Sequence, residues 1–129
     1  EDPLGYVQFF GTVPRPDELL AFQVVGDSMI GDEIHDGDCV LLRHAEIQNG
    51  QIGAVVVDGE TTLKRIYREH GLLRLVPSNP RYEPIVILQS EMDSCRILGR
   101  LEATISNLSG EVVWFNTSNG VSDLTIFLN

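Results

Sequence analysis

Sustained helical periodicity is almost absent from this sequence, and its absence limits the folds open to the chain. Short apolar, β-rich runs are separated instead by Gly, Pro, Asn and Asp, which is the punctuation of a β protein. Strands are predicted at residues 6–10, 20–25, 39–43, 53–57, 61–67, 72–76, 85–88 and 97–105, with two more at 112–116 and 124–128. Helical pieces are expected only at 16–19 and 28–34. We therefore expect a mainly β fold with minimal helix.

Turn residues fix how some of these strands connect. Asp58-Gly59 predicts a two-residue hairpin turn, because both positions tolerate a positive φ. Residues 68–71 predict a slightly longer loop between the next two strands. Three prolines then interrupt the pattern after residue 76 and predict an irregular, extended link, at Pro77, Pro80 and Pro84.

Length and charge exclude several classes of protein. A chain of 129 residues is one ordinary globular domain, too short for a dinucleotide-binding enzyme with a substrate domain or for a (β/α)8 barrel. Its net charge of −10 repels phosphate backbones and anionic lipid. No apolar run reaches the ~20 residues of a membrane span, and no secretory signal opens the sequence. With two cysteines, Cys39 and Cys95, we expect a reduced, cytoplasmic protein.

Ser28 is the first candidate for chemistry. It follows an apolar strand within Gly26-Asp27-Ser28-Met29, where the backbone turns sharply and its amides are free to form an oxyanion hole. A serine in such a turn is also a common hydrogen-bonding turn residue. A nucleophilic serine needs a base, and His35, His44 and His70 all look like surface histidines without an obvious orienting acid.

Lys64 is the better candidate for that base. Alternation along residues 61–67 puts Thr62, Lys64 and Ile66 on one face of a strand that has apolar residues on both faces. Burial would lower the pKa of the lysine and supply a neutral amine, which could act on Ser28 as general base and then as general acid. The alternative is a lysine whose ammonium reaches water, beside Arg65.

Several segments together resemble the LexA/UmuD-type self-cleaving proteins, the peptidase S24-like family. Residues 25–29 and 34–42 resemble the nucleophile segment of that family, and residues 50–65 its lysine segment. Residues 73–85 match the strand and proline turn that follow, and residues 97–101 the late strand. The resemblance covers about residues 22–105, and both the order of the motifs and the spacing from Ser28 to Lys64 fit.

The resemblance implies a compact twisted sheet or partly open barrel and a Ser–Lys dyad, with Ser28 as nucleophile, Lys64 as base and the backbone amides of Asp27 and Ser28 as the oxyanion hole. It also implies cleavage of one bond in the protein's own linker, stimulated by a RecA filament on single-stranded DNA. In repressors of this family, cleavage separates a DNA-binding domain from a dimerising domain. A homodimer is therefore expected, with DNA bound only through an N-terminal domain that this sequence lacks.

The cleavage region departs from the family pattern. Residues 5–11 stand where members commonly have a Gly-x-Val-Ala-Ala-Gly-like stretch, and they carry two bulky aromatics before Gly11. Phe10-Gly11 is thus a possible scissile bond, although a site shaped for alanine would resist phenylalanine. Alternatively, Phe9 and Phe10 are core residues of the first strand. The tether from Gly11 to Ser28 is also short, which restricts how a loop can enter its own site.

We divide the chain into an N-terminal arm (1–19), a Ser–Lys peptidase domain (20–105) and a C-terminal β extension (106–129). The extension is either a pair of added strands or a dimer contact, for which Trp114 and Phe127 are plausible anchors.

Three other interpretations stay open: a non-cleaving dimerisation or regulatory module of a repressor, a UmuD-like accessory protein of a polymerase, and a peptidase acting on other chains. No metal or other cofactor is expected. The acidic run that contains Asp32, Glu33, Asp36 and Asp38 lacks the spacing of a calcium loop and predicts a solvated turn.

Overall fold

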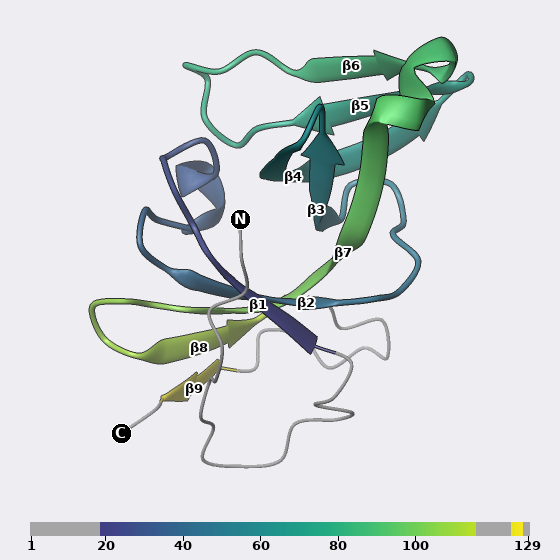
Figure 1. Cartoon of the computed structure of the whole chain (residues 1–129). Helices are drawn as coiled ribbons and strands as arrows, with labels where there is room; N and C mark the ends of the chain where they lie inside the picture. The colour runs from purple at the N-terminus through teal and green to yellow at the C-terminus, as the bar shows by residue number, and fades with distance from the viewer. Residues whose placement is uncertain (1–18, 116–124, 128–129) are drawn as a thin grey trace.

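The computed structural model describes residues 19–115 and 125–127, and within them it confirms a mainly β fold (Figure 1). The strands are β1 (Leu19–Gln23), β2 (Cys39–Arg43), β3 (Ile52–Val57), β4 (Glu60–Glu69), β5 (Leu72–Val76), β6 (Ile85–Leu88), β7 (Cys95–Ile105), β8 (Glu111–Trp114) and β9 (Thr125–Phe127). Two 3-10 helices, η2 (Ile30–Asp32) and η3 (Gln89–Ser94), are the helical elements of this part of the chain. Its helices include none that is long and apolar enough to cross a membrane.

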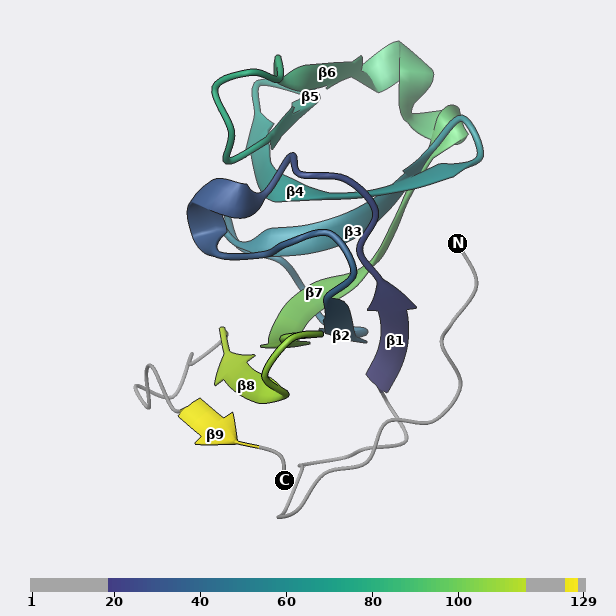
Figure 2. The same cartoon turned by 90° about the vertical axis from the view of Figure 1, so that its left-hand side faces the viewer.

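The strands form one antiparallel sheet in the order β1-β2-β7-β3-β4-β5-β6, with β8 added to β7 and β9 to β8. Strand β7 is the link between two groups of strands: it runs from β3, β4, β5 and β6 down to β1, β2 and β8 (Figure 1). The sheet is twisted and not closed, as the fold class predicted. Its bend lets β1, from one group, approach β4, from the other (Figure 2).

Close packing of backbones helps to make this bend. A Cβ atom added to Gly99 of β7 would lie 2.9 Å from the carbonyl oxygen of Arg43, and one added to Gly53 of β3 would lie 2.8 Å from that of Gly99. The ladders shift register beside these glycines, between Leu41 and Leu42 and between Ala54 and Val55. Such bulges turn a strand sharply and increase its twist.

Buried side chains gather in three clusters. The cluster beneath the candidate site contains Phe22, Met29, Ile34, Val40, Leu42, Ile52, Ala54 and Leu101. A second lies between β3, β4, β5 and β6 and contains Ile47, Val55, Ile66, Leu73, Leu75 and Ile87. A third connects β1, β2, β7 and β8. The first cluster ties the segment after β1 to β2, β3 and β7, so it holds the two strand groups together around the site.

The strands predicted at 39–43, 72–76 and 85–88 have the predicted bounds, and the other predicted strands within the described residues differ at their ends. The prediction for residues 6–10 lies outside the described residues. Asp58 and Gly59 have φ of 50° and 85°, as the hairpin turn requires. The predicted loop at 68–71 is wrong, because Arg68 and Glu69 continue β4 and the turn is made by His70 and Gly71 alone, with φ of 46° and 78°.

The helical predictions need correction. Leu19 begins β1, and the rest of the predicted helix at 16–19 lies outside the described residues. The predicted helix at 28–34 is reduced to the three residues of η2, because Glu33 adopts a left-handed φ of 62° and ends it. The 3-10 helix η3 was not predicted. Its Glu91 side chain accepts a hydrogen bond from the backbone amide of Leu88, which satisfies a donor at the start of the helix.

The apolar cluster between β4, β5 and β6 gives a test of the packing. Leu75 is fully buried (0% exposed), so Leu75→Ala removes packed methyl groups and should lower the free energy of unfolding by about 2–5 kcal/mol. Leu88 on the neighbouring strand is 50% exposed, so Leu88→Ala should change it by only about 0.5 kcal/mol. Urea denaturation of both variants measures the difference, and equal losses would contradict the described packing.

Candidate active site

Ser28 lies in a sharp turn between β1 and η2. Just after β1, Val24 is hydrogen-bonded to the segment that precedes β2. Its amide donates to the carbonyl of Asp38 (2.8 Å), and its carbonyl accepts from the amide of Gly37 (2.8 Å). Gly26 then takes a φ of +93°, which strains any residue that has a Cβ. Its amide donates to the Asp36 carboxylate (2.7 Å). The glycine before the serine is therefore needed for the turn that reverses the chain at Ser28.

Lys64 reaches Ser28 from β4. Pairing with β3 sets Lys64 opposite Gly53, and alternation along β4 buries Lys64 and Ile66 on the same face. The Lys64 side-chain amine lies 3.0 Å from Ser28 Oγ, and the Lys64 residue is 7% exposed. Its other contacts are Thr62 Oγ1 (2.6 Å) and the carbonyl of Leu63 (3.2 Å). The residue predicted to be a base and the residue predicted to be a nucleophile are thus brought together.

The electrostatic surroundings of Lys64 favour the neutral amine. Burial lowers the pKa of Lys64 below its ordinary value of 10.5, because an ammonium loses hydration there. Across residues 19–115, no carboxylate forms an ion pair with Lys64 that would restore the charged form. The alternative of a lysine whose ammonium reaches water beside Arg65 does not describe this side chain, because Lys64 is buried.

The backbone N–H groups of Asp27 and Ser28 are the predicted oxyanion donors. Within the described residues, the amides of Asp27 and Ser28 donate to no protein acceptor, whereas their carbonyls are both bonded. Free amides beside a serine hydroxyl can stabilise the negative charge that develops on a carbonyl oxygen under attack. The predicted oxyanion hole therefore has its donors available.

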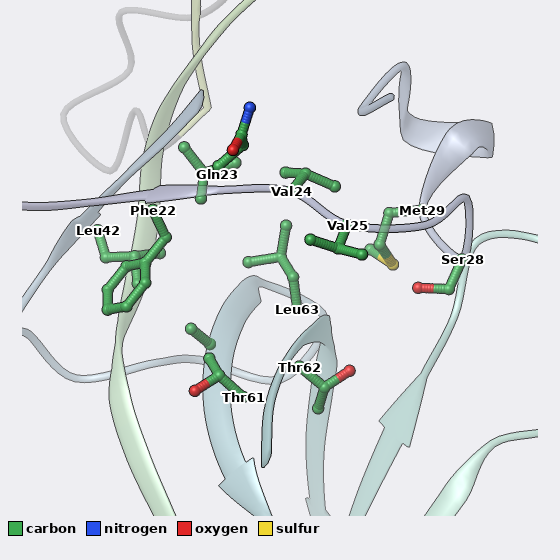
Figure 3. Close-up of a pocket in the computed structure, with 12 residues that line it drawn as sticks. Phe22, Gln23, Val24, Val25, Ser28, Met29, Leu42, Thr61, Thr62 and Leu63 are labelled. Carbon is green, nitrogen blue, oxygen red and sulfur yellow. The ribbon is translucent and has the colours of Figure 1, made fainter. Parts of the chain in front are cut away.

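A narrow cleft extends from Ser28 between two strand edges. Figure 3 shows Val24 and Val25 on one side, Thr61, Thr62 and Leu63 on the other, and Ser28 at one end. The cleft has a volume of about 80 Å³ and an apolar floor that includes Leu42 and Ala54. Among the described strands, β1 pairs with β2 alone, and β5 pairs with β4 only from Arg65 onward. Along the cleft, the edge of β1 away from β2 and the start of β4 away from β3 therefore pair with no other described strand.

Other candidate groups lie elsewhere. His35, His44 and His70 are exposed, as predicted, although His35 does have an acid near it, because its Nδ1 is 3.8 Å from Asp38. Cys39 and Cys95 are free thiols, and burial together with the charge of Asp38 raises the pKa of Cys39 to about 11. A thiol that stays protonated is a poor nucleophile.

The acidic run is not simply a solvated turn. Asp38 is buried (4% exposed) and accepts hydrogen bonds from the amides of His35 and Asn107, and Asp32 forms an ion pair with Arg65. Asp36 accepts a hydrogen bond from the amide of Gly26, so this carboxylate supports the turn at Ser28. The described residues contain no group of three or more histidines, cysteines or acids arranged to hold a metal ion.

The site also includes residues that the sequence did not identify as functional. Thr62 contacts the Lys64 amine, and its position two residues earlier on the same face of β4 was a usable signal. The loop between β5 and β6 contacts the Ser28 turn through Asn79 and Tyr82. No local pattern indicated that contact, since the two segments are about fifty residues apart in the chain.

The fold and the site define a β protein in which a buried lysine contacts a serine at the end of a narrow cleft. A model of the Peptidase S24-like family matches residues 3–102, and the chain belongs to that family. This confirms the resemblance drawn from the sequence.

Curated relatives are LexA repressors from several bacteria. The chain is 37% identical over 100 residues to the LexA repressor of Clostridium perfringens (strain SM101 / Type A), covering 77% of this chain and 44% of that protein. It is 51% identical over 79 residues to LexA repressor 2 of Pseudomonas putida, covering 60% and 38%. It is 45% identical over 89 residues to the LexA repressor of Streptomyces coelicolor, covering 68% and 36%. The chain spans less than half the length of these relatives.

The state of the Lys64 amine can be measured directly, because Lys64 is the only lysine in the 129-residue sequence. Selective 13Cε-lysine labelling should give one side-chain signal that titrates below 10.5, with the amine neutral above the midpoint. In Ser28→Ala the midpoint should stay low, since burial is the cause of the shift. A midpoint at or above 10.5 in the folded chain would contradict the described burial.

Proposed function

We propose that this chain is the C-terminal self-cleavage and dimerisation domain of a LexA-like transcriptional repressor. In this proposal it hydrolyses a peptide bond in its own linker with a Ser28–Lys64 dyad, in response to a DNA-damage signal carried by a RecA filament. The observation that carries the proposal is the 3.0 Å contact between the Lys64 amine and Ser28 Oγ in a buried site. A neutral amine at hydrogen-bond distance from a hydroxyl is the arrangement of a general base and its nucleophile.

The proposed reaction has two stages. Neutral Lys64 takes the proton of Ser28 as Oγ attacks the scissile carbonyl carbon, and the amides of Asp27 and Ser28 stabilise the oxyanion. The resulting ammonium gives its proton to the leaving amine as the carbon–nitrogen bond breaks, which leaves an acyl ester on Ser28. Water, deprotonated by Lys64, then attacks the ester, and the released Ser28 oxygen recovers the proton.

The cleft favours an extended peptide as substrate. A segment lying between β1 and β4 can pair along either strand edge, as an added strand does, because neither edge is paired with a described strand there. One of its carbonyls then lies at Ser28, at the end of the cleft (Figure 3). The arm at residues 1–19 is the proposed source of this segment. Residues 1–18, including the candidate bond Phe10–Gly11, lie outside the described residues.

The role in a repressor is inferred from the LexA relatives, which are longer than this chain. With a net charge of −10, the domain itself is poorly suited to bind DNA, so DNA contact is assigned to another part of the full protein. We place that protein in the cytoplasm. The C-terminal extension, in which β8 pairs with β7, supplies the proposed homodimer contact.

Self-cleavage is the direct test of the dyad. The purified chain, incubated alone or with an activated RecA filament, should cut itself faster as pH rises toward the pKa of Lys64, because the base is the deprotonated amine. Ser28→Ala and Lys64→Met should each lower the rate at least about 10³-fold. Ser94→Ala, which removes an exposed hydroxyl outside the cleft, is the matched control.

Cutting by both dyad variants at the rate of the unmodified chain would remove the peptidase assignment. If the unmodified chain forms a dimer and never cuts, the function reduces to a dimerisation or regulatory module of a repressor.

The position of the cut tests the candidate bond. Mass spectrometry should find a fragment ending at Phe10. Because the cleft is only about 80 Å³, Phe10→Ala should increase the cleavage rate by at least tenfold, since a methyl group fits where a benzyl group is crowded. Phe9→Ala, one position earlier, provides the comparison. A fragment with another end would exclude Phe10–Gly11 as the bond.

A further inference from the structure

The loop between β5 and β6 bonds the turn at residues 26–31, which we name the nucleophile turn, at three points. Both views place this loop beside the segment that leads to η2 (Figures 1 and 2). The side-chain amide of Asn79 donates to the carbonyl of Asp27 (2.9 Å). The amide of Ser78 donates to the carbonyl of Ser28 (2.9 Å), and the amide of Gly31 donates back to the carbonyl of Ser78 (2.7 Å). The loop thus bonds the residue before Ser28, Ser28 itself and Gly31, which lies three residues later in η2.

These bonds fix the direction of the amides as well as the position of the chain. In a trans peptide the carbonyl of one residue and the N–H of the next point in opposite directions. No cis bond occurs in the described residues. A hydrogen bond that fixes the Asp27 carbonyl therefore aims the N–H of Ser28 the opposite way, away from Asn79. That N–H is one of the proposed donors to the oxyanion.

The orientation of the Asn79 side chain is fixed by its own contacts. It is buried (6% exposed), and its Oδ1 accepts a hydrogen bond from the amide of Arg81 (3.0 Å). Because a backbone amide can only donate and a carbonyl can only accept, the two partners fix which end of the side chain faces Asp27. Its own carbonyl accepts from the amide of Tyr82 (3.1 Å), which closes the loop around it.

Tyr82 adds a contact on the outer side of the turn. Its hydroxyl donates to the Asp27 carboxylate (2.5 Å), and that hydrogen bond and the carboxylate charge raise the pKa of Tyr82. Tyr82 is 45% exposed, so water competes for this bond. The Asn79 bond is made by a buried side chain and acts on the peptide plane itself, beside a longer bond from the amide of Ile30 to the same carbonyl (3.4 Å).

We propose that Asn79 is a positioning residue for self-cleavage, which orients the Ser28 amide as an oxyanion donor by bonding the Asp27 carbonyl. The inference rests on the proposed function. Asn79 does not contact Ser28 Oγ or the Lys64 amine in this structure, so its effect is transmitted through the backbone. Loss of a whole oxyanion donor costs about 10²–10³-fold in rate, and misdirecting one donor should cost at least about tenfold.

The test compares Asn79→Ala with Asn49→Ala. Asn49 is a matched control, because its side chain also donates to a backbone carbonyl and accepts from a backbone amide, both of Arg68, but lies outside the nucleophile turn. Self-cleavage rates are measured across pH, below the thermal transition of each variant. Asn79→Ala should lower the plateau rate at least tenfold and leave the pH midpoint unchanged, since the Lys64 contacts are intact. Asn49→Ala should change neither.

A second measurement reports the orientation without any catalysis. Residual dipolar couplings of the Ser28 N–H bond should change in Asn79→Ala and not in Asn49→Ala. If Asn79→Ala does not fold, Asn79→Asp keeps the shape and the Arg81 bond but loses the donor, and it is compared at the plateau pH, where the charge of Lys64 no longer limits the rate.

An unchanged plateau rate in a folded variant, or an unchanged Ser28 coupling, overturns the positioning role. A lower plateau with a shifted midpoint also overturns it, because the effect would then act through Lys64. If the unmodified chain does not cut at all, the proposed function fails and the role in self-cleavage fails with it. The coupling then tests only the orientation of the Ser28 amide: a change confined to the Asn79 variant supports that orientation, and no change overturns it.

Discussion

A lysine amine held out of water is the constraint on which this structure depends. An ammonium in an apolar surrounding is costly unless it is paired, and the described residues offer Lys64 two hydroxyls and a carbonyl in place of a carboxylate. The apolar cluster beneath the site keeps water away from it. The fold therefore stabilises the neutral amine, which is the form that can remove a proton from Ser28.

Three separate segments have to meet for this arrangement to exist. Strand β4 supplies Lys64 and Thr62, the turn after β1 supplies Ser28, and the loop between β5 and β6 holds that turn. The bend around β7 brings the edges of β1 and β4 to face each other. One geometry thus places Ser28 beside the Lys64 amine, its proposed base, and opens the cleft that we propose as the binding site of an extended peptide.

Much of the strand pattern could be predicted from the sequence, because β-rich runs and turn residues are local signals. Burial of Lys64 was also foreseeable, since both faces of its strand carry apolar residues. Local patterns did not predict that β4 extends to Glu69, where pairing with β5 outweighs the expected loop, or that Asp38 is buried to accept backbone amides. Nor could they predict the contact between Asn79 and Asp27, which depends on how distant segments pack.

The role of Lys64 as the base is tested most directly by following, in the same sample, the titration of this single lysine and the pH dependence of self-cleavage. If the neutral amine of Lys64 is the base, the rate must rise with the fraction of deprotonated lysine, and the two midpoints should agree within about half a pH unit, a free-energy difference of about 0.7 kcal/mol. Cleavage that reaches its plateau while Lys64 is still fully protonated would contradict the account.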